Sequence, residues 1–242
     1  MKTLIEVRLK RGLSLILGNV GTGKTTLCRK MVQMFKERTD IKVNMILDPL
    51  YKDESSFIDD LLRIFGIKKR FYMSIQDKKD HIKNFLLDQT INQKKTIVLI
   101  IDEAQKMTVE SLEVLRMLLN FETNDEKLLQ LILVGQLELK KQLKKMPNLV
   151  DRIGFKCLLE PLADKEELKN MIDYRISVVG EKKVDDLFSS DAIEAIFKES
   201  HGFPRKIGML CHKALRELVM RDDLELISGN LIREMAEEEK VL

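Results

Sequence analysis

The stretch LILGNVGTGKTTLCRK, Leu15–Lys30, places three glycines, a lysine and three threonines between an apolar run and a run of helical periodicity. The apolar run, Leu13–Leu17, is too short for a helix and predicts a buried strand that ends at Gly18. After Lys24, apolar residues recur at helical spacing, which predicts a helix over about Lys24–Lys36. The glycines therefore lie in a loop that joins a strand to a helix.

This loop matches the spacing G-x-x-x-x-G-K-[ST], which is typical of phosphate-binding loops (P-loops). Glycines let backbone N–H groups close around phosphate oxygens, and the N-terminus of the following helix favours an anion. The residues expected to bind the nucleotide are Gly18, Asn19, Val20, Gly21, Thr22, Gly23, Lys24, Thr25 and Thr26. Lys24 is expected on the β- and γ-phosphates, the Thr25 hydroxyl on Mg²⁺, and Thr26 on the α-phosphate. The alternative is a glycine turn that only starts a helix.

Two carboxylates follow a second buried strand in VLIIDE, Val98–Glu103. Asp102 at the strand end is predicted to hold Mg²⁺ through water, and Glu103 to act as a general base on the attacking water. The alternative is a pair of solvated acids that cap the next helix, which starts near Thr108.

A third buried strand, in LILVGQ at Leu131–Gln136, ends in an amide. Ligand sites of such sheets lie beyond the carboxyl ends of the strands, so Gln136 is predicted to orient the water or touch the γ-phosphate. The alternative is a plain turn residue after Gly135.

Strands alternate with helices over the first two thirds of the chain, which predicts an α/β fold with a mainly parallel sheet flanked by helices. The predicted strands are Leu13–Leu17, Lys42–Leu47, Thr96–Ile101, Leu128–Val134 and Phe155–Leu158. The predicted helices between them are Lys24–Lys36, Ser56–Phe65, Asp77–Gln89, Thr108–Asn120 and Glu138–Lys145. This P-loop domain is predicted to span Met1–Glu160.

After Pro161 only helical periodicity remains, which predicts a C-terminal helical lid domain over Pro161–Leu242. Its predicted helices are Ala163–Val179, Ser190–Ser200, Arg205–Met220 and Ser228–Glu238. Opening and closing of this lid would transmit the nucleotide state to a partner.

The composition gives weaker indications about location and partners. The formal net charge is only +3, which predicts neither a protein that coats nucleic acid nor an acidic protein. The three cysteines are far apart without a CxxC pair, which indicates reduced thiols in the cytoplasm. No apolar run approaches the ~20 residues of a membrane span, and the start MKTLIEVRLKRG has no signal-peptide pattern. Lysines 140, 141, 144 and 145 cluster in LKKQLKKM, which is either a DNA-binding patch or a solvated helix face.

The motifs GNVGTGKTTLCR and IIDEAQKM resemble the Walker A and Walker B motifs of the AAA+ ATPases. Together with LEVLRMLLNFET, KLLQLILVGQLEL, VDRIGFKCLLEPL and GFPRKIGMLCHKAL, they resemble the ExeA/GspA branch, the general secretion pathway A proteins. The resemblance runs from about Leu13 to about Leu218. It implies a Mg²⁺-dependent ATPase that self-associates as a ring or filament.

The resemblance also implies roles for two arginines. Arg152, in VDRIGF, lies where many AAA+ proteins carry an arginine finger, which would enter the neighbouring subunit's site. The alternative is a surface arginine paired with Asp151. Arg205, in GFPRK, resembles the second sensor that reaches the γ-phosphate; the alternative is a side chain that faces water.

Three functions remain open from the sequence. The first is an ATPase that assembles a secretion or envelope complex, as in type II secretion. The second is a DNA-binding ATP switch of the transposition-helper kind that recruits a transposase. The third is a nucleotide-binding module that never turns over.

Overall fold

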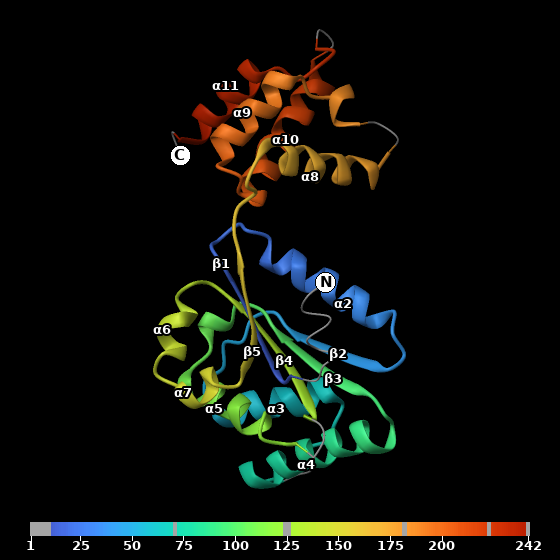
Figure 1. The fold of residues 1–242 in the computed structure, drawn as a ribbon, viewed down its shortest axis with the longest axis vertical. Helices are drawn as coiled ribbons and strands as arrows, with labels where there is room; N and C mark the ends of the chain where they lie inside the picture. Colours follow the sequence, from blue (N-terminus) through green and yellow to red (C-terminus); the bar gives the residue numbers. More distant parts are fainter. Residues whose placement is uncertain (1–10, 70–71, 123–126, 181–182, 222–223, 241–242) are drawn as a thin grey trace. The chain divides into compact units, whose positions relative to one another are not determined.

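The computed structural model describes residues 11–69, 72–122, 127–180, 183–221 and 224–240 (Figure 1). The chain divides into two compact units. The first comprises Met1–Asn19 and Lys24–Leu159, and the second comprises Val20–Gly23 and Glu160–Leu242. Residues 1–10, on which the prediction of a start without a signal peptide depends, lie outside the described part.

Five parallel strands form the sheet of the first unit, in the order β2-β3-β4-β1-β5. Their bounds are β1 Leu13–Gly18, β2 Ile41–Ile46, β3 Thr96–Ile101, β4 Leu129–Gly135 and β5 Ile153–Leu159. The predicted α/β class with a mainly parallel sheet is confirmed. The three middle strands are buried along nearly their whole length because helices cover both faces, which explains their continuous apolar sequences.

The helix that follows the P-loop covers one face of this sheet. It is α2, Lys24–Lys36, and its side chains Cys28, Met31 and Phe35 pack with Ile16 and other residues of the central strands. Figure 1 shows α2 and α3 on opposite sides of the strands. The helical periodicity after Lys24 is thus the pattern of a helix that buries one face.

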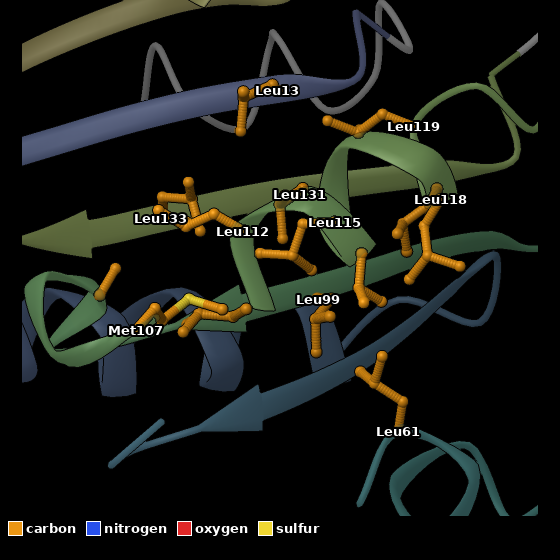
Figure 2. Packing of buried hydrophobic residues seen from close by; sticks show 14 of the residues in the cluster. Leu13, Leu61, Leu99, Met107, Leu112, Leu115, Leu118, Leu119, Leu131 and Leu133 are labelled. Carbon is orange, nitrogen blue, oxygen red and sulfur yellow. The ribbon is translucent and has the colours of Figure 1, made fainter. Parts of the chain in front are cut away.

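The opposite face of the sheet carries a larger leucine-rich core. Its helices are α3 Glu54–Phe65, α4 Ile75–Leu87, α5 Val109–Leu118, α6 Leu139–Leu143 and α7 Pro147–Val150. Figure 2 shows Leu112 and Leu115 of α5 beside Leu131 and Leu133 of β4. The side chain of Thr108 caps α5 by accepting the Ser111 N–H, so the acids of VLIIDE do not supply this cap.

Several predicted boundaries differ from the structure by two residues, and three of these differences have a physical reason. α4 ends at Leu87 and a π-helical turn, Asp88–Asn92, follows. The lysine-rich helix is only Leu139–Leu143, because a second short helix starts at Pro147, a residue that suits the first helical turn but cannot continue a helix. β5 begins at Ile153, before the predicted start, because the exposed Gly154 interrupts the apolar pattern.

The second unit is helical. It contains α8 Lys165–Ser177, a 3₁₀ turn at Val184–Asp186, α9 Ser190–Ser200, α10 Pro204–Met220 and α11 Gly229–Lys240. These helices share a core of their own that includes Leu168, Ile196, Ile207 and Ile232. Within the described residues of the chain, no helix combines the length and the apolar character that crossing a bilayer requires.

Candidate nucleotide-binding site

The P-loop connects β1 directly to α2. Gly21 and Gly23 adopt φ angles of +85° and +90°, which lie in the region that side chains other than glycine rarely adopt. An added Cβ at Gly23 would meet no atom within 4 Å, so the backbone angle rather than crowding accounts for glycine there. The predicted strand, loop and helix are all present at the predicted positions.

Lys24 lies over the start of this loop. Its Nζ donates to the carbonyl oxygens of Gly18 at 3.1 Å and Asn19 at 2.9 Å, and its side chain is buried. A buried ammonium group requires polar partners, and two carbonyl dipoles supply them here. The cation is therefore held at the loop that is predicted to receive phosphate.

The acid predicted to hold the metal lies beside the threonine predicted to share it. Asp102 is 1% exposed, and the Thr25 hydroxyl donates to its Oδ2 at 2.6 Å. The Glu103 N–H donates to the other carboxylate oxygen at 2.9 Å. A buried carboxylate next to a hydroxyl is an oxygen donor set that suits Mg²⁺, so these residues fit the ion.

Glu103 stands at the end of β3 in an unusual backbone conformation. Its φ of +53° lies in the left-handed region, where a side chain without β-branching is uncommon but tolerated. Its Oε2 accepts a hydrogen bond from Gln105 Nε2 at 2.7 Å and a longer one from Gln136 Nε2 at 3.4 Å. The structure thus brings the predicted base and the predicted amide together.

Gln105 is the residue of this site that the sequence analysis missed. Besides donating to Glu103, its Oε1 accepts the Gln136 backbone N–H at 3.0 Å, so one side chain ties the ends of β3 and β4 together. A Cβ at Gly135 would lie 3.0 Å from this Oε1, which makes glycine the residue that permits the approach. The IIDEAQ motif contained the signal, because it places an amide two residues after the base.

The remaining loop residues differ in their surroundings. Thr22 is buried, whereas Val20 and Thr26 are exposed. The tip Val20–Gly23 belongs to the second unit, where the Arg205 N–H donates to the Gly21 carbonyl at 3.2 Å. The Arg205 side chain itself is exposed, so the described contact to the loop is made by its backbone.

Arg152 lies at the opposite end of the parallel strands from the P-loop. It precedes Ile153, which pairs with Leu13 at the start of β1, whereas the loop follows the end of β1. Within the described residues it forms no ion pair with Asp151. Its charge helps Lys127, whose effect is larger, to lower the pKa of Glu122. The predicted finger therefore lies away from the other site residues of its own chain.

Comparison with known proteins identifies a family and two similar proteins. A family model described as an AAA domain matches residues 7–143. General secretion pathway protein A of Aeromonas hydrophila is 32% identical over 229 residues, which is 91% of this chain and 39% of that protein. A potential ATP-binding protein of Staphylococcus aureus is 32% identical over 114 residues, 47% of this chain and 40% of that protein. The chain thus spans about two fifths of the length of both relatives.

Solved structures share the fold at low sequence identity. The ORC2 protein of Aeropyrum pernix, in ADPNP–ADP complexes, has a TM-score of 0.71 at 19% identity, covering 98% of this chain and 67% of that one. Cdc6p of Pyrobaculum aerophilum has a TM-score of 0.73 at 17% identity, covering 98% and 65%. A mutant of RuvB from Thermotoga maritima has a TM-score of 0.62 at 20% identity, covering 100% and 69%.

Proposed function

Because this chain belongs to the AAA domain family, we propose that it hydrolyses ATP in a Mg²⁺-dependent reaction at the site around Lys24, Asp102 and Glu103. The observation that carries this proposal is the 2.6 Å hydrogen bond from the Thr25 hydroxyl to the buried Asp102 carboxylate. It joins the helix of the P-loop to the acid at the end of β3. A glycine turn that only started a helix would not require this buried contact.

The phosphate-binding part of the proposal rests on charge and on backbone donors. The Lys24 ammonium group, now shared between two carbonyl oxygens, would turn to the negatively charged phosphates. Thr25 and Asp102 would hold Mg²⁺, which when bound neutralises charge on the phosphates. The family gives ATP as the nucleotide.

In the proposed chemical step, Glu103 acts as the general base. Its carboxylate takes a proton from the attacking water while the new P–O bond forms, and the bond from the γ-phosphorus to the bridging oxygen breaks to release ADP. Gln105 and Gln136 both donate to Glu103 Oε2, so they would fix the direction in which the carboxylate points. We assign Gln105 as a positioning residue on this basis.

Arg152 would act on the site of a neighbouring copy. A guanidinium group near the transferring phosphoryl group stabilises the charge that develops there. Its place at the start of β5, opposite the P-loop, supports a role in a second subunit rather than in its own. A shared site requires self-association, as a ring or a filament.

We propose two candidate cellular roles for the domain. Similarity to General secretion pathway protein A favours assembly of a secretion or envelope complex, with Arg205 and the helical unit relaying the nucleotide state. The free thiols Cys28, Cys157 and Cys211 favour a reducing, cytoplasmic setting. A DNA-binding switch that recruits a transposase is the second candidate, and the lysines around 140–145 favour it.

The test of the ATPase proposal separates binding from turnover. Lys24→Ala should lose binding of a fluorescent ATP analogue, whereas Glu103→Gln should bind it and release no ADP above background. Thr25→Val should raise the Mg²⁺ concentration needed for half-maximal turnover by about tenfold or more, and Thr25→Ser should restore it. An unchanged Mg²⁺ requirement in Thr25→Val would refute the assigned metal site.

One further measurement chooses between the two cellular roles. Duplex DNA should leave turnover unchanged if the domain serves a protein complex. Stimulation by DNA that falls steeply with salt would instead favour the DNA-binding switch, since released counterions drive such binding. Neither result depends on the catalytic assignments above.

A further inference from the structure

An apolar groove runs along β5, one of the two edge strands of the described sheet, and belongs entirely to the first unit. We call it the β5 groove. It has a volume of about 420 Å³. Leu15 and Leu17 of β1 and Leu143 of α6 line its floor, and three lysines, 140, 144 and 156, line it as well.

The groove follows from the strand order and from the shortness of the neighbouring helices. In the β1–β5 pairing, Leu15 lies opposite Lys156 and Leu17 opposite Leu158, so these pairs share a face of the sheet. Because α6 is only five residues long, it does not cover this face out to the edge. Leu158 is consequently 49% exposed at the end of a strand whose neighbour β1 is buried.

The charge around the groove has one sign. Lys140 and Lys144 lie one helical turn apart along the chain, and Lys156 faces them from β5 as a third lining residue. Each of the three is exposed, and within the described part of the chain none of them forms an ion pair. The residues that line the groove include no acid. Apolar surface and unneutralised cations are therefore combined in one place.

We propose that the β5 groove docks a short amphipathic segment of a partner protein, with apolar side chains on one face and carboxylates beside them. The apolar face would cover Leu158 and the leucine floor, which burial from water favours. The carboxylates would pair with the lysines at the rim, where charge complementarity sets the choice of partner. This proposal does not depend on ATP hydrolysis.

The apolar floor argues for a protein segment over nucleic acid. Binding to phosphates needs cations, and a leucine floor contributes nothing to it. The lysine cluster of the sequence divides accordingly: Lys140 and Lys144 line the groove, whereas Lys141 and Lys145 are exposed and do not line it. These two pairs lie on one segment and carry equal charge, so they supply a matched comparison.

The experiment uses fluorescence anisotropy without nucleotide. The probe is a labelled peptide with leucines at helical spacing on one face and glutamates on the other, with a scrambled peptide of the same composition, a lysine version and a short DNA duplex for comparison. Lys140→Glu with Lys144→Glu should weaken binding of the acidic peptide by about tenfold or more. Lys141→Glu with Lys145→Glu should change it less than about twofold.

A second pair of variants tests the apolar floor. Leu158→Gln should weaken binding severalfold, whereas Leu50→Gln, at a leucine that is 71% exposed elsewhere in the same unit, should not. Circular dichroism on heating would verify that all variants fold alike. Equal losses in the two lysine pairs, equal binding of the scrambled peptide, no binding of the acidic peptide, or stronger binding of the duplex would each overturn the proposal. The last outcome would assign the lysines to nucleic acid.

Discussion

Mixing two inactive variants tests whether neighbouring subunits complete one site. Arg152→Ala keeps its own base, and Glu103→Gln keeps its own arginine. In the structure Arg152 stands beside Ile153, which pairs with Leu13, whereas the P-loop follows Gly18 at the other end of the same strand. The six residues of β1 span roughly 16 Å at about 3.3 Å per residue, which separates Arg152 from its own loop. Direct contact of the Arg152 guanidinium with phosphates is therefore expected at the site of another copy rather than at its own.

The expected size of the effect follows from counting interfaces. Removal of an arginine finger lowers turnover by about 10³- to 10⁵-fold, so each variant alone should remain near background. In an equimolar mixture that assembles at random, about one interface in four joins an intact Glu103 to an intact Arg152. The mixture should recover about a quarter of wild-type turnover, measured as ADP release in a coupled assay. Turnover per wild-type subunit should also rise with protein concentration.

Two results would refute the shared site. The first is full activity of Arg152→Ala by itself. The second is a mixture that stays at background although light scattering shows that the two variants assemble together. Arg63→Ala is a suitable control, because Arg63 is an exposed arginine of the same unit that pairs with Asp60. Its turnover should equal that of the wild type, alone and in every mixture.

Three further outcomes can be measured on single variants. Gln105→Leu should lower kcat by about ten- to a hundredfold with KM little changed, because Glu103 loses its closest donor; an unchanged kcat would contradict the positioning role. Burial raises the pKa of Cys28 to about 12, and the Asp102 charge adds to the rise, so its alkylation at pH 8 should be about 10³-fold slower than that of an ordinary cysteine and should accelerate as the pH rises. Leu115→Ala, at a side chain that is 0% exposed, should lower the free energy of unfolding by about 2–5 kcal/mol in urea titrations, whereas a loss below about 1 kcal/mol would contradict the packing seen in Figure 2.

The central strands could be predicted from the sequence because both of their faces are buried. A short apolar run rich in β-branched residues, such as TIVLII, favours a strand covered on both faces, and β3 has the predicted bounds, Thr96–Ile101. The edge strand β5 was harder, since one of its faces is exposed and its pattern includes Gly154 and Lys156. The short helix α7 was missed because four residues are too few to show helical periodicity.

The residues of the candidate site also differ in how far the sequence could predict them. The P-loop lies within one continuous motif, so its residues could be found from spacing alone. Thr25 and Asp102 were predicted to hold the same Mg²⁺ ion, but their direct hydrogen bond was not predicted. The role of Gln105 depends on which strands are neighbours. Its Oε1 meets the Gln136 N–H only because β3 and β4 are adjacent and because Gly135 leaves room. Sequence spacing does not specify that adjacency.

The strand order also separates the candidate nucleotide site from the surfaces proposed for partners. The residues around the candidate nucleotide site follow β1, β3 and β4, which are consecutive in the sheet. The edge strand β5 contributes no residue to that group; it starts beside Arg152 and lines the β5 groove. β1 alone lies between β5 and the rest of the sheet. β1 leads directly into the P-loop. A segment that contacts Leu15 and Leu17 in the groove therefore contacts the strand that ends at Gly18. If both proposals hold, a docked segment would therefore influence the site through β1, and Leu158→Gln should need a severalfold higher concentration of the acidic peptide than the wild type for the same change in turnover.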